Sequence, residues 1–139
     1  MKRTRPDLVP FLALIVALAL LATACATLRD NIRKAAIISG EVALNIDTDE
    51  QALYASGAYS ADTHKQIGEA IVVMLTAVRA YERAARAWPE NVAMPANVPA
   101  AMAEALQAVA TVERIIADIP GNGKLMANLA HVRSAIGGQ

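Results

Sequence analysis

The sequence predicts an all-α fold, a small antiparallel bundle of three or four helices preceded by an N-terminal signal or anchor helix. Alanine, the strongest helix former, is abundant throughout the 139 residues. Apolar residues recur at alternating spacings of four and three positions, which is the pattern of amphipathic helices. No stretch alternates β-branched and polar residues for long enough to predict a sheet. Clusters of glycine and proline separate the periodic stretches and mark the turns of one small domain.

The N-terminus has the three-part layout of a bacterial export signal. Three basic residues outnumber the single acidic residue before position 8, so this end is expected to stay in the cytoplasm. Residues 8–21 are an apolar run of 14 residues, which suits a signal core and is short for a membrane span. Three small residues, Ala22-Thr23-Ala24, complete the layout.

Cys25, the only cysteine, directly follows Ala22-Thr23-Ala24, and this arrangement resembles the lipobox of bacterial lipoproteins. Ala22 stands where that family favours leucine but tolerates alanine. The resemblance implies that residues 1–24 are removed and that Cys25 carries lipid, including palmitate, as the new N-terminus. Ala26, in place of aspartate, implies export to the periplasmic face of the outer membrane. A lone cysteine has no disulfide partner in an oxidising compartment, so a covalent lipid accounts for it economically.

Two other interpretations of the N-terminus stay open. Residues 22–24 also fit the A-x-A pattern of ordinary signal cleavage, which would release a soluble periplasmic protein. Alternatively, residues 8–26 contain 19 residues without a charge, enough for an uncleaved anchor in the inner membrane. In each case residues 25–139 are expected to form the helical domain.

The first helix of this domain is predicted over residues 27–56. Gly40 weakens its middle, and two of its inward positions are polar. Thr48 and Gln51 have the spacing of a capping box, so the helix is expected to kink or split near residue 47. The inward positions are Leu28, Ile32, Ala35, Ser39, Val42, Ile46, Asp49 and Leu53.

A turn is predicted over residues 56–60. Gly57 can take the left-handed conformation that follows a helix end, and Ser60 can cap the next helix. Tyr54 and Tyr59 flank this turn, where aromatic rings plug the end of a bundle or meet a partner.

The second helix is predicted over residues 61–87 and is ended by Pro89. Val72 and Leu75 are expected to widen its apolar face. Its heptad spacing also suits a homo-oligomer. The inward positions are Ile67, Ile71, Met74, Val78, Tyr81, Ala85 and Trp88, of which Tyr81 and Trp88 are expected to close the bundle.

Two further helices follow a proline-containing linker over residues 88–97. The third helix is predicted over residues 99–118 with Asn97 as its cap, and the fourth over residues 124–136 after the helix-breaking residues 120–123. The inward positions are Met102, Leu106, Val109, Val112, Ile116 and Ile119 in the third helix, and Leu125, Leu129, Val132 and Ile136 in the fourth.

The inventory of reactive residues is small. His64 and His131 have no carboxylate within helical reach, and their separation does not match metal-ligand spacing, so both are expected to be exposed or partly buried helix residues. Asp47, Asp49 and Glu50 lack the oxygen ladder and glycine of a calcium loop, so a solvated helix face or cap is expected. The sequence therefore predicts no catalytic residue, no metal site and no cofactor, and hence a protein that is not an enzyme.

Charge limits the partners of the domain. Of 13 basic and 13 acidic residues, three basic and one acidic precede Cys25, so the remainder carries a charge of about −2 and nucleic acid is not expected to bind. Arg79, Arg83 and Arg86 share one stripe of the second helix, with Glu82 within i,i+4 reach of Arg86. This stripe is a candidate surface for anionic lipid headgroups or an acidic partner, and its alternative is an ordinary charged outer face.

Residues 54–63 resemble small alanine-rich helical lipoproteins encoded by phages and prophages, in which a Ser-Gly-x-x-Ser turn joins the first two helices. The resemblance covers residues 25–88 and implies no catalytic residues. The leading hypothesis is a membrane-tethered binding or scaffold module of the envelope with an unknown protein partner, which blocks a receptor or excludes a second phage. The alternative is the outer-membrane part of a spanin-like lysis system. A cell-wall hydrolase is disfavoured because no paired carboxylates or metal ligands can be assembled.

Overall fold

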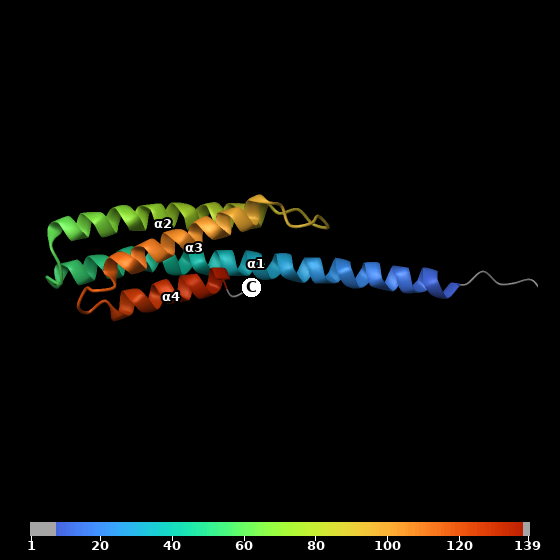
Figure 1. The fold of residues 1–139 in the computed structure, drawn as a ribbon, viewed down its shortest axis with the longest axis horizontal. Helices are drawn as coiled ribbons and strands as arrows, with labels where there is room; N and C mark the ends of the chain where they lie inside the picture. The colour runs from blue at the N-terminus through green and yellow to red at the C-terminus, as the bar shows by residue number, and fades with distance from the viewer. Residues whose placement is uncertain (1–7, 138–139) are drawn as a thin grey trace, which may run out of the picture.

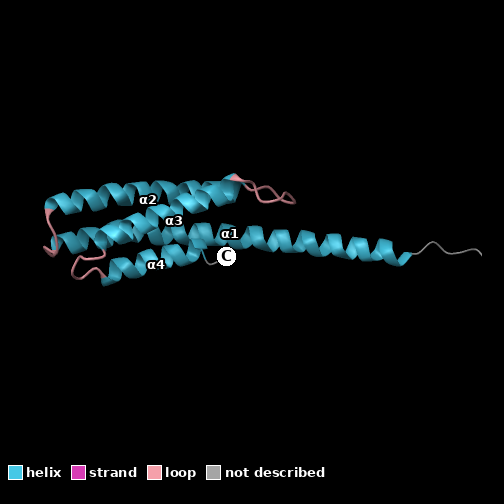
Figure 2. Cartoon of the chain, viewed as in Figure 1, coloured by secondary structure: helices cyan, strands magenta, loops and turns pink. Residues whose placement is uncertain are grey.

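The computed structural model describes residues 8–137, and within its first helix the side chains of residues 8–16 and 18–22 and of Cys25 fall outside that description. Residues 8–137 contain helices and no strand, which confirms the all-α prediction (Figure 2). The four helices are α1 (Leu8–Ala55), α2 (Ala61–Ala87), α3 (Asn97–Ile116) and α4 (Gly123–Gly137).

Successive helices run in opposite directions and form an up-down-up-down bundle (Figure 1). α1 packs against α2 and α4, and α3 packs against the same two helices, so the four surround one core. α1 is far longer than its neighbours, and its N-terminal half projects beyond the bundle (Figure 1). The bundle therefore has two distinct ends. We call the end from which α1 projects the proximal end, and the end with the α1–α2 turn the distal end.

The expected break near residue 47 is wrong, because α1 is one continuous helix of 48 residues. Thr48 does not cap a new helix. The acidic residues beside it, Asp49 and Glu50, are instead 9% and 0% exposed and point into the bundle, where other helices supply their partners. The same polar residues that suggested a helix restart thus serve contacts between helices.

The α1–α2 turn follows the prediction closely. Gly57 has a φ of 78°, and the Ser60 Oγ accepts a hydrogen bond from the Thr63 backbone N–H at 3.2 Å. All seven predicted inward positions of α2 are buried. Val72 is a correction, since it is 63% exposed rather than part of the apolar face. It directly follows the buried Ile71, and one helical residue turns the side chain by about 100° away from the core.

α3 begins two residues earlier than expected. Asn97 is already helical, so it does not cap the helix, and no side chain caps the amides there. Instead, the Pro95 carbonyl accepts from the Val98 N–H at 3.0 Å. At the other end of α3, the Asn122 side chain donates to the Ile116 carbonyl at 2.7 Å.

The core consists of aliphatic side chains, many alanines and two aromatic residues, Tyr81 and Trp88, that are 0% and 2% exposed. Ser39 is also buried, and its hydroxyl donates to the Ala36 carbonyl at 2.9 Å. Leu28 departs from the prediction at 40% exposed, because the buried stripe of α1 begins only at Ile32. The predicted inward positions that are half-buried are Val42, Leu53, Met102, Leu106 and Ile119.

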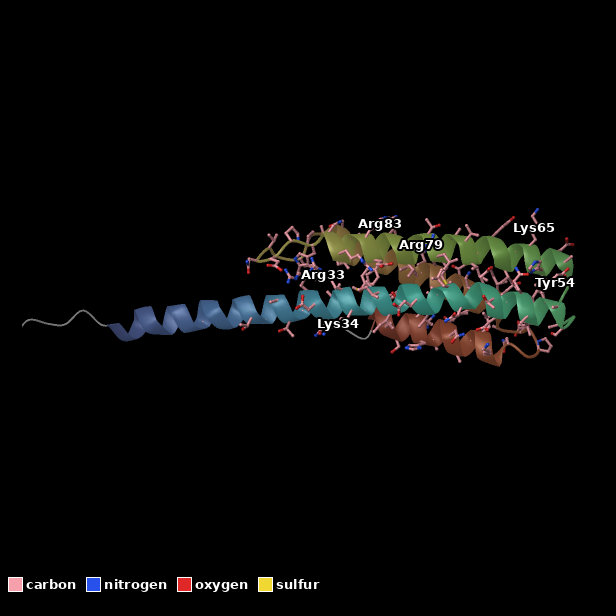
Figure 3. All side chains as sticks on the ribbon, turned by 180° about the vertical axis from the view of Figure 1, so that it is seen from behind. Arg33, Lys34, Tyr54, Lys65, Arg79 and Arg83 are labelled. Atoms are coloured by element: carbon pink, nitrogen blue, oxygen red, sulfur yellow. The ribbon has the colours of Figure 1, made fainter. Side chains whose placement is uncertain are left out.

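Arg33 joins α1 to the C-terminus of α2. Its guanidinium donates to three backbone carbonyls there, at 3.1 Å to Ala85, 3.0 Å to Arg86 and 2.6 Å to Trp88. The last carbonyls of a helix have no partner within the helix and carry partial negative charge, so a planar cation is a favourable cap. Figure 3 shows Arg33 directed toward this end of α2, whereas Lys34 lies on another side of α1.

We predict that Arg33→Met lowers the free energy of unfolding by about 2 kcal/mol, because it leaves the capped carbonyls without a charged donor. Chemical denaturation followed by circular dichroism measures this loss. Arg33→Lys should recover part of it, since one ammonium cannot span three carbonyls. The matched control is Lys34→Met, an exposed neighbour expected to change stability by less than about 0.5 kcal/mol. Equal losses for Arg33→Met and Lys34→Met would contradict the capping role.

Candidate functional site

A cluster of polar and aromatic side chains lies at the distal end, around the carboxylate of Glu50. The Tyr59 hydroxyl lies 2.5 Å from Glu50 Oε1, and His64 Nδ1 lies 2.8 Å from the same oxygen. A carboxylate only accepts, so both neighbours donate to it. The Tyr54 ring stacks on His64 with centroids 4.0 Å apart and lies 5.7 Å from Tyr59. We call Glu50, Tyr54, Tyr59 and His64 the distal cluster.

The Glu50 carboxylate is only half satisfied. Oε1 accepts two hydrogen bonds, while Oε2 is buried and has no hydrogen-bond partner among the described residues. Burying such an oxygen costs free energy unless the remaining bonds are strong. The short hydrogen bonds from Tyr59 and His64 therefore offset the cost of burying the Glu50 carboxylate.

The Glu50 carboxylate also affects the pKa of Tyr59. Burial raises the pKa of the Tyr59 hydroxyl above its ordinary value, and the hydrogen bond to Glu50 and the charge of that residue raise the pKa further. Burial also raises the pKa of Tyr81, whose hydroxyl has no hydrogen-bond partner among the described residues. Both phenols are thus held in the neutral form.

The expectation of a solvated acidic face over residues 47–50 is correct only for Asp47, which is exposed. Asp49 joins α1 to α4, because it accepts from the Asn128 amide at 2.5 Å and lies 2.6 Å from Lys124 Nζ. Sequence reasoning missed both acidic contacts, since the partners lie on other helices. The carboxylate partner of His64 lies on α1, outside the reach of its own helix, and His131 is exposed.

The chemistry open to the distal cluster is limited. Glu50 is 0% exposed, so a substrate cannot reach its carboxylate in this conformation. Among residues 8–137, as far as their side chains are described, no three His, Cys, Asp or Glu side chains group in a way that could hold a metal ion. What the arrangement does is tie the start of α2 to the end of α1 at the α1–α2 turn.

The basic stripe of α2 lies where the sequence placed it. Arg79, Arg83 and Arg86 are all exposed, and Figure 3 shows Arg79 and Arg83 along this helix. Arg86 pairs with Glu82 at 2.7 Å, as the i,i+4 spacing predicts. Arg79 and Arg83 have no ion-pair partner within the described part of the chain, so their charges are free to meet another molecule.

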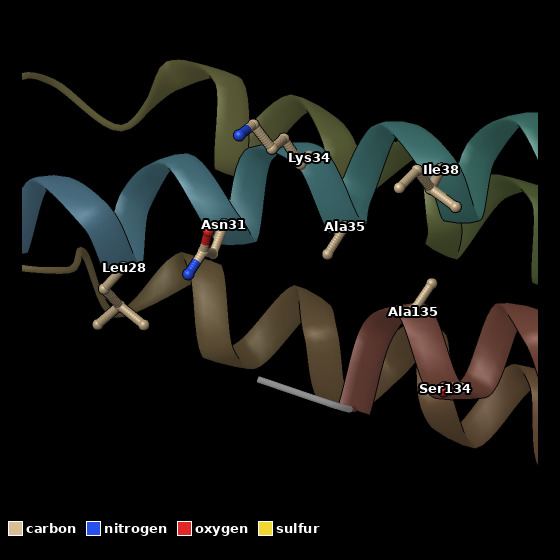
Figure 4. A pocket seen from close by; sticks show the side chains of 7 residues that line it. All are labelled: Leu28, Asn31, Lys34, Ala35, Ile38, Ser134 and Ala135. Atoms are coloured by element: carbon tan, nitrogen blue, oxygen red, sulfur yellow. The ribbon is translucent and has the colours of Figure 1, made fainter.

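An open groove of about 400 Å³ runs between α1 and the end of α4 (Figure 4). Ala35 and Ala135 face each other across it, and small side chains there keep the two helices close (Figure 4). Lys34 is the only ionisable residue in its lining, which offers no acid, base or nucleophile pair for catalysis. The lining residues are Leu28, Asn31, Lys34, Ala35, Ile38, Ser134 and Ala135.

The predicted lipidation residue, Cys25, lies in the projecting half of α1, and its side chain is outside the described residues, as are residues 1–7 of the predicted signal. Among the residues whose side chains the structure describes, no helix is both long and apolar enough to cross a bilayer. Comparisons with protein-family models, with curated proteins and with solved structures find no match to this chain.

We predict that Glu50→Ala lowers the free energy of unfolding by about 3 kcal/mol, because it removes the shared acceptor of Tyr59 and His64. Glu50→Gln should cost less, since its amide oxygen can still accept. Denaturant unfolding of both variants measures the difference. The control is Glu41→Ala, which removes an exposed carboxylate from the same helix. A loss for Glu50→Ala no larger than for Glu41→Ala would show that the distal cluster does not stabilise the fold.

We also predict that stability falls at alkaline pH. The raised pKa of Tyr59 and Tyr81 in the folded state means that the unfolded chain loses these protons first, near pH 10. The contribution of the two tyrosines to the free energy of unfolding is therefore complete below about pH 10. Above that pH it decreases by about 1.4 kcal/mol per pH unit for each tyrosine.

Unfolding free energies between pH 8 and 11.5 test this dependence. Tyr59→Phe and Tyr81→Phe should each make the alkaline decline less steep, whatever they do to stability at pH 8. If the double variant declines as steeply as the natural chain, the two phenols are not the cause.

Proposed function

We propose that this chain is a lipid-anchored, non-enzymatic protein of the bacterial envelope whose helical bundle binds or scaffolds another protein. The observation that carries the proposal is the continuity of α1. Cys25 and the first core residue, Ile32, belong to the same unbroken helix. At 1.5 Å per residue they lie only about 10 Å apart along the helix axis. An anchor at Cys25 would therefore hold the bundle against the membrane without a flexible linker.

This arrangement would determine which end of the bundle faces the outer membrane on its periplasmic side. The proximal end would face the bilayer, and the distal cluster would point away from it. Arg79 and Arg83 would be displayed on the side of α2, where an acidic partner could reach them. Tyr54 and Tyr59, both half-buried at the distal end, offer aromatic contact area to the same partner.

Within this class, we propose that a phage-encoded role be tested first, namely receptor blocking or exclusion of a second phage. Such a role needs an anchored binding surface and no reactive site. Bacteria that express the chain should then adsorb or admit a challenging phage less well than bacteria that express Cys25→Ser. The spanin-like alternative instead requires that deletion of the chain delay host lysis.

We predict that radiolabelled palmitate labels the natural chain and not Cys25→Ser, because acylation of the thiol supplies the proposed anchor. Membrane fractionation followed by intact-mass analysis of the purified chain measures the modification. The expected product lacks residues 1–24 and carries acyl groups on residue 25. A retained Met1, or an unmodified sulfur in a membrane-bound chain, would contradict the lipid anchor.

A further inference from the structure

The loop between α2 and α3, residues 88–96, lies at the proximal end of the bundle (Figure 1). Two contacts fix it there. Glu90 pairs with Arg29 of α1 at 3.4 Å, and the Trp88 carbonyl accepts from Arg33 at 2.6 Å. Arg29 is four residues after Cys25 in the same helix, which is about 6 Å along the axis. The loop therefore sits beside the point where the proposed anchor would meet the bilayer.

This loop exposes apolar side chains, and a hydrogen bond from the buried Trp88 fixes its backbone. Val92 and Met94 are 48% and 40% exposed, although both are large and hydrophobic. The indole N–H of Trp88, itself 2% exposed, donates to the Val92 carbonyl at 2.8 Å. Trp88 thus fixes the loop to the core while Val92 and Met94 stay outside.

Most of the charged side chains beside the loop have partners, and Arg83, one helical turn before the end of α2, is the exception. Arg29 lies 3.3 Å from Asp30 and 3.4 Å from Glu90, and Arg86 pairs with Glu82. The guanidinium of Arg33 is committed to carbonyls of α2 and the loop. The exposed side chains of Val92 and Met94 are therefore the part of the loop that an uncharged, apolar neighbour could contact.

We propose that Val92 and Met94 insert into the boundary between lipid headgroups and acyl chains, so that residues 88–96 form a second membrane contact beside the anchor. The inference rests on the proposed function, since it needs the proximal end at a bilayer. A lipid surface is the occupant because the loop lies on the anchor's side of the bundle, exposes Val92 and Met94, and has its one charged residue, Glu90, paired with Arg29. One anchor leaves the bundle free to rotate about α1, whereas a second contact fixes which side of α2 faces the periplasm.

The test places a tryptophan at the loop and at a matched site. The full-length chain, purified from membranes of the producing bacteria, is reconstituted into phosphatidylcholine vesicles with and without brominated acyl chains, which quench tryptophan on contact. Val92→Trp and Met94→Trp report on the loop. Val73→Trp is the control, because Val73 is 62% exposed in α2 away from the proximal end. The natural chain, with Trp88 as its only tryptophan, gives the baseline.

We expect brominated lipid to remove most of the emission added by Val92→Trp and Met94→Trp, and little of that added by Val73→Trp. The quenching should persist in high salt, as an apolar contact requires. Equal, weak quenching at all three positions would overturn the inference. Quenching that needs phosphatidylglycerol and disappears in salt would also overturn it, because arginines rather than the loop would then make the contact.

Failure of the proposed function gives a different result. A chain that does not float with the vesicles is not anchored, and this is seen before any fluorescence is measured. A second copy of the chain over the loop would protect the added tryptophans from brominated lipid and produce a concentration-dependent dimer in detergent, which would overturn the membrane contact while leaving the anchor intact.

Discussion

The structure depends on one constraint, that α1 continues without a break from Cys25 into the core of the bundle. Among the described side chains of α1, the buried ones begin at Ile32, so this helix contributes to the core through its last 24 residues, from Ile32 to Ala55. A straight helix transmits position and orientation, since its backbone hydrogen bonds leave no hinge. An attachment at residue 25 would therefore also set the direction of the bundle axis.

Polar interactions at both ends of the bundle hold α2 against α1. At the proximal end, Arg33 caps the C-terminus of α2 by donating hydrogen bonds to its last carbonyls. At the distal end, Glu50 fixes the first turn of α2 through Tyr59 and His64. The core between them combines alanines with larger aliphatic residues. The contacts of Arg33 and Glu50 therefore join α1 to α2 at the two opposite ends of that core.

The two ends of the bundle also differ in the side chains that they expose. The proximal end carries exposed apolar residues on a loop held by Trp88, and Glu90 of that loop is paired with Arg29. The distal end presents partly exposed aromatic rings above a buried carboxylate. An anchored protein that faces lipid at one end and a protein partner at the other needs this kind of difference.

Sequence periodicity predicts the helices well. Every position that the spacing predicted to point inward in the second and fourth helices is buried in the structure. Gly57 and Gly121, with φ of 78° and 79°, mark turns that local chemistry requires. The distal cluster could not be found by searching along single helices. One signal was present, since Glu50 and His64 are each seven residues from Gly57 and antiparallel helices bring such positions level. The contact of Asp49 with Asn128 has no such signal, because it spans 79 residues.

The continuity of α1 at the proposed anchor is tested most directly by hydrogen exchange on the chain reconstituted in vesicles. Amides of residues 30–34 would donate to carbonyls of residues 26–30 even if residues 1–24 were removed. The account predicts that these amides exchange as slowly as those of residues 35–46 in the bundle. Exchange as fast as that of residues 90–94 in the loop would show a flexible joint between anchor and bundle, and would contradict the account.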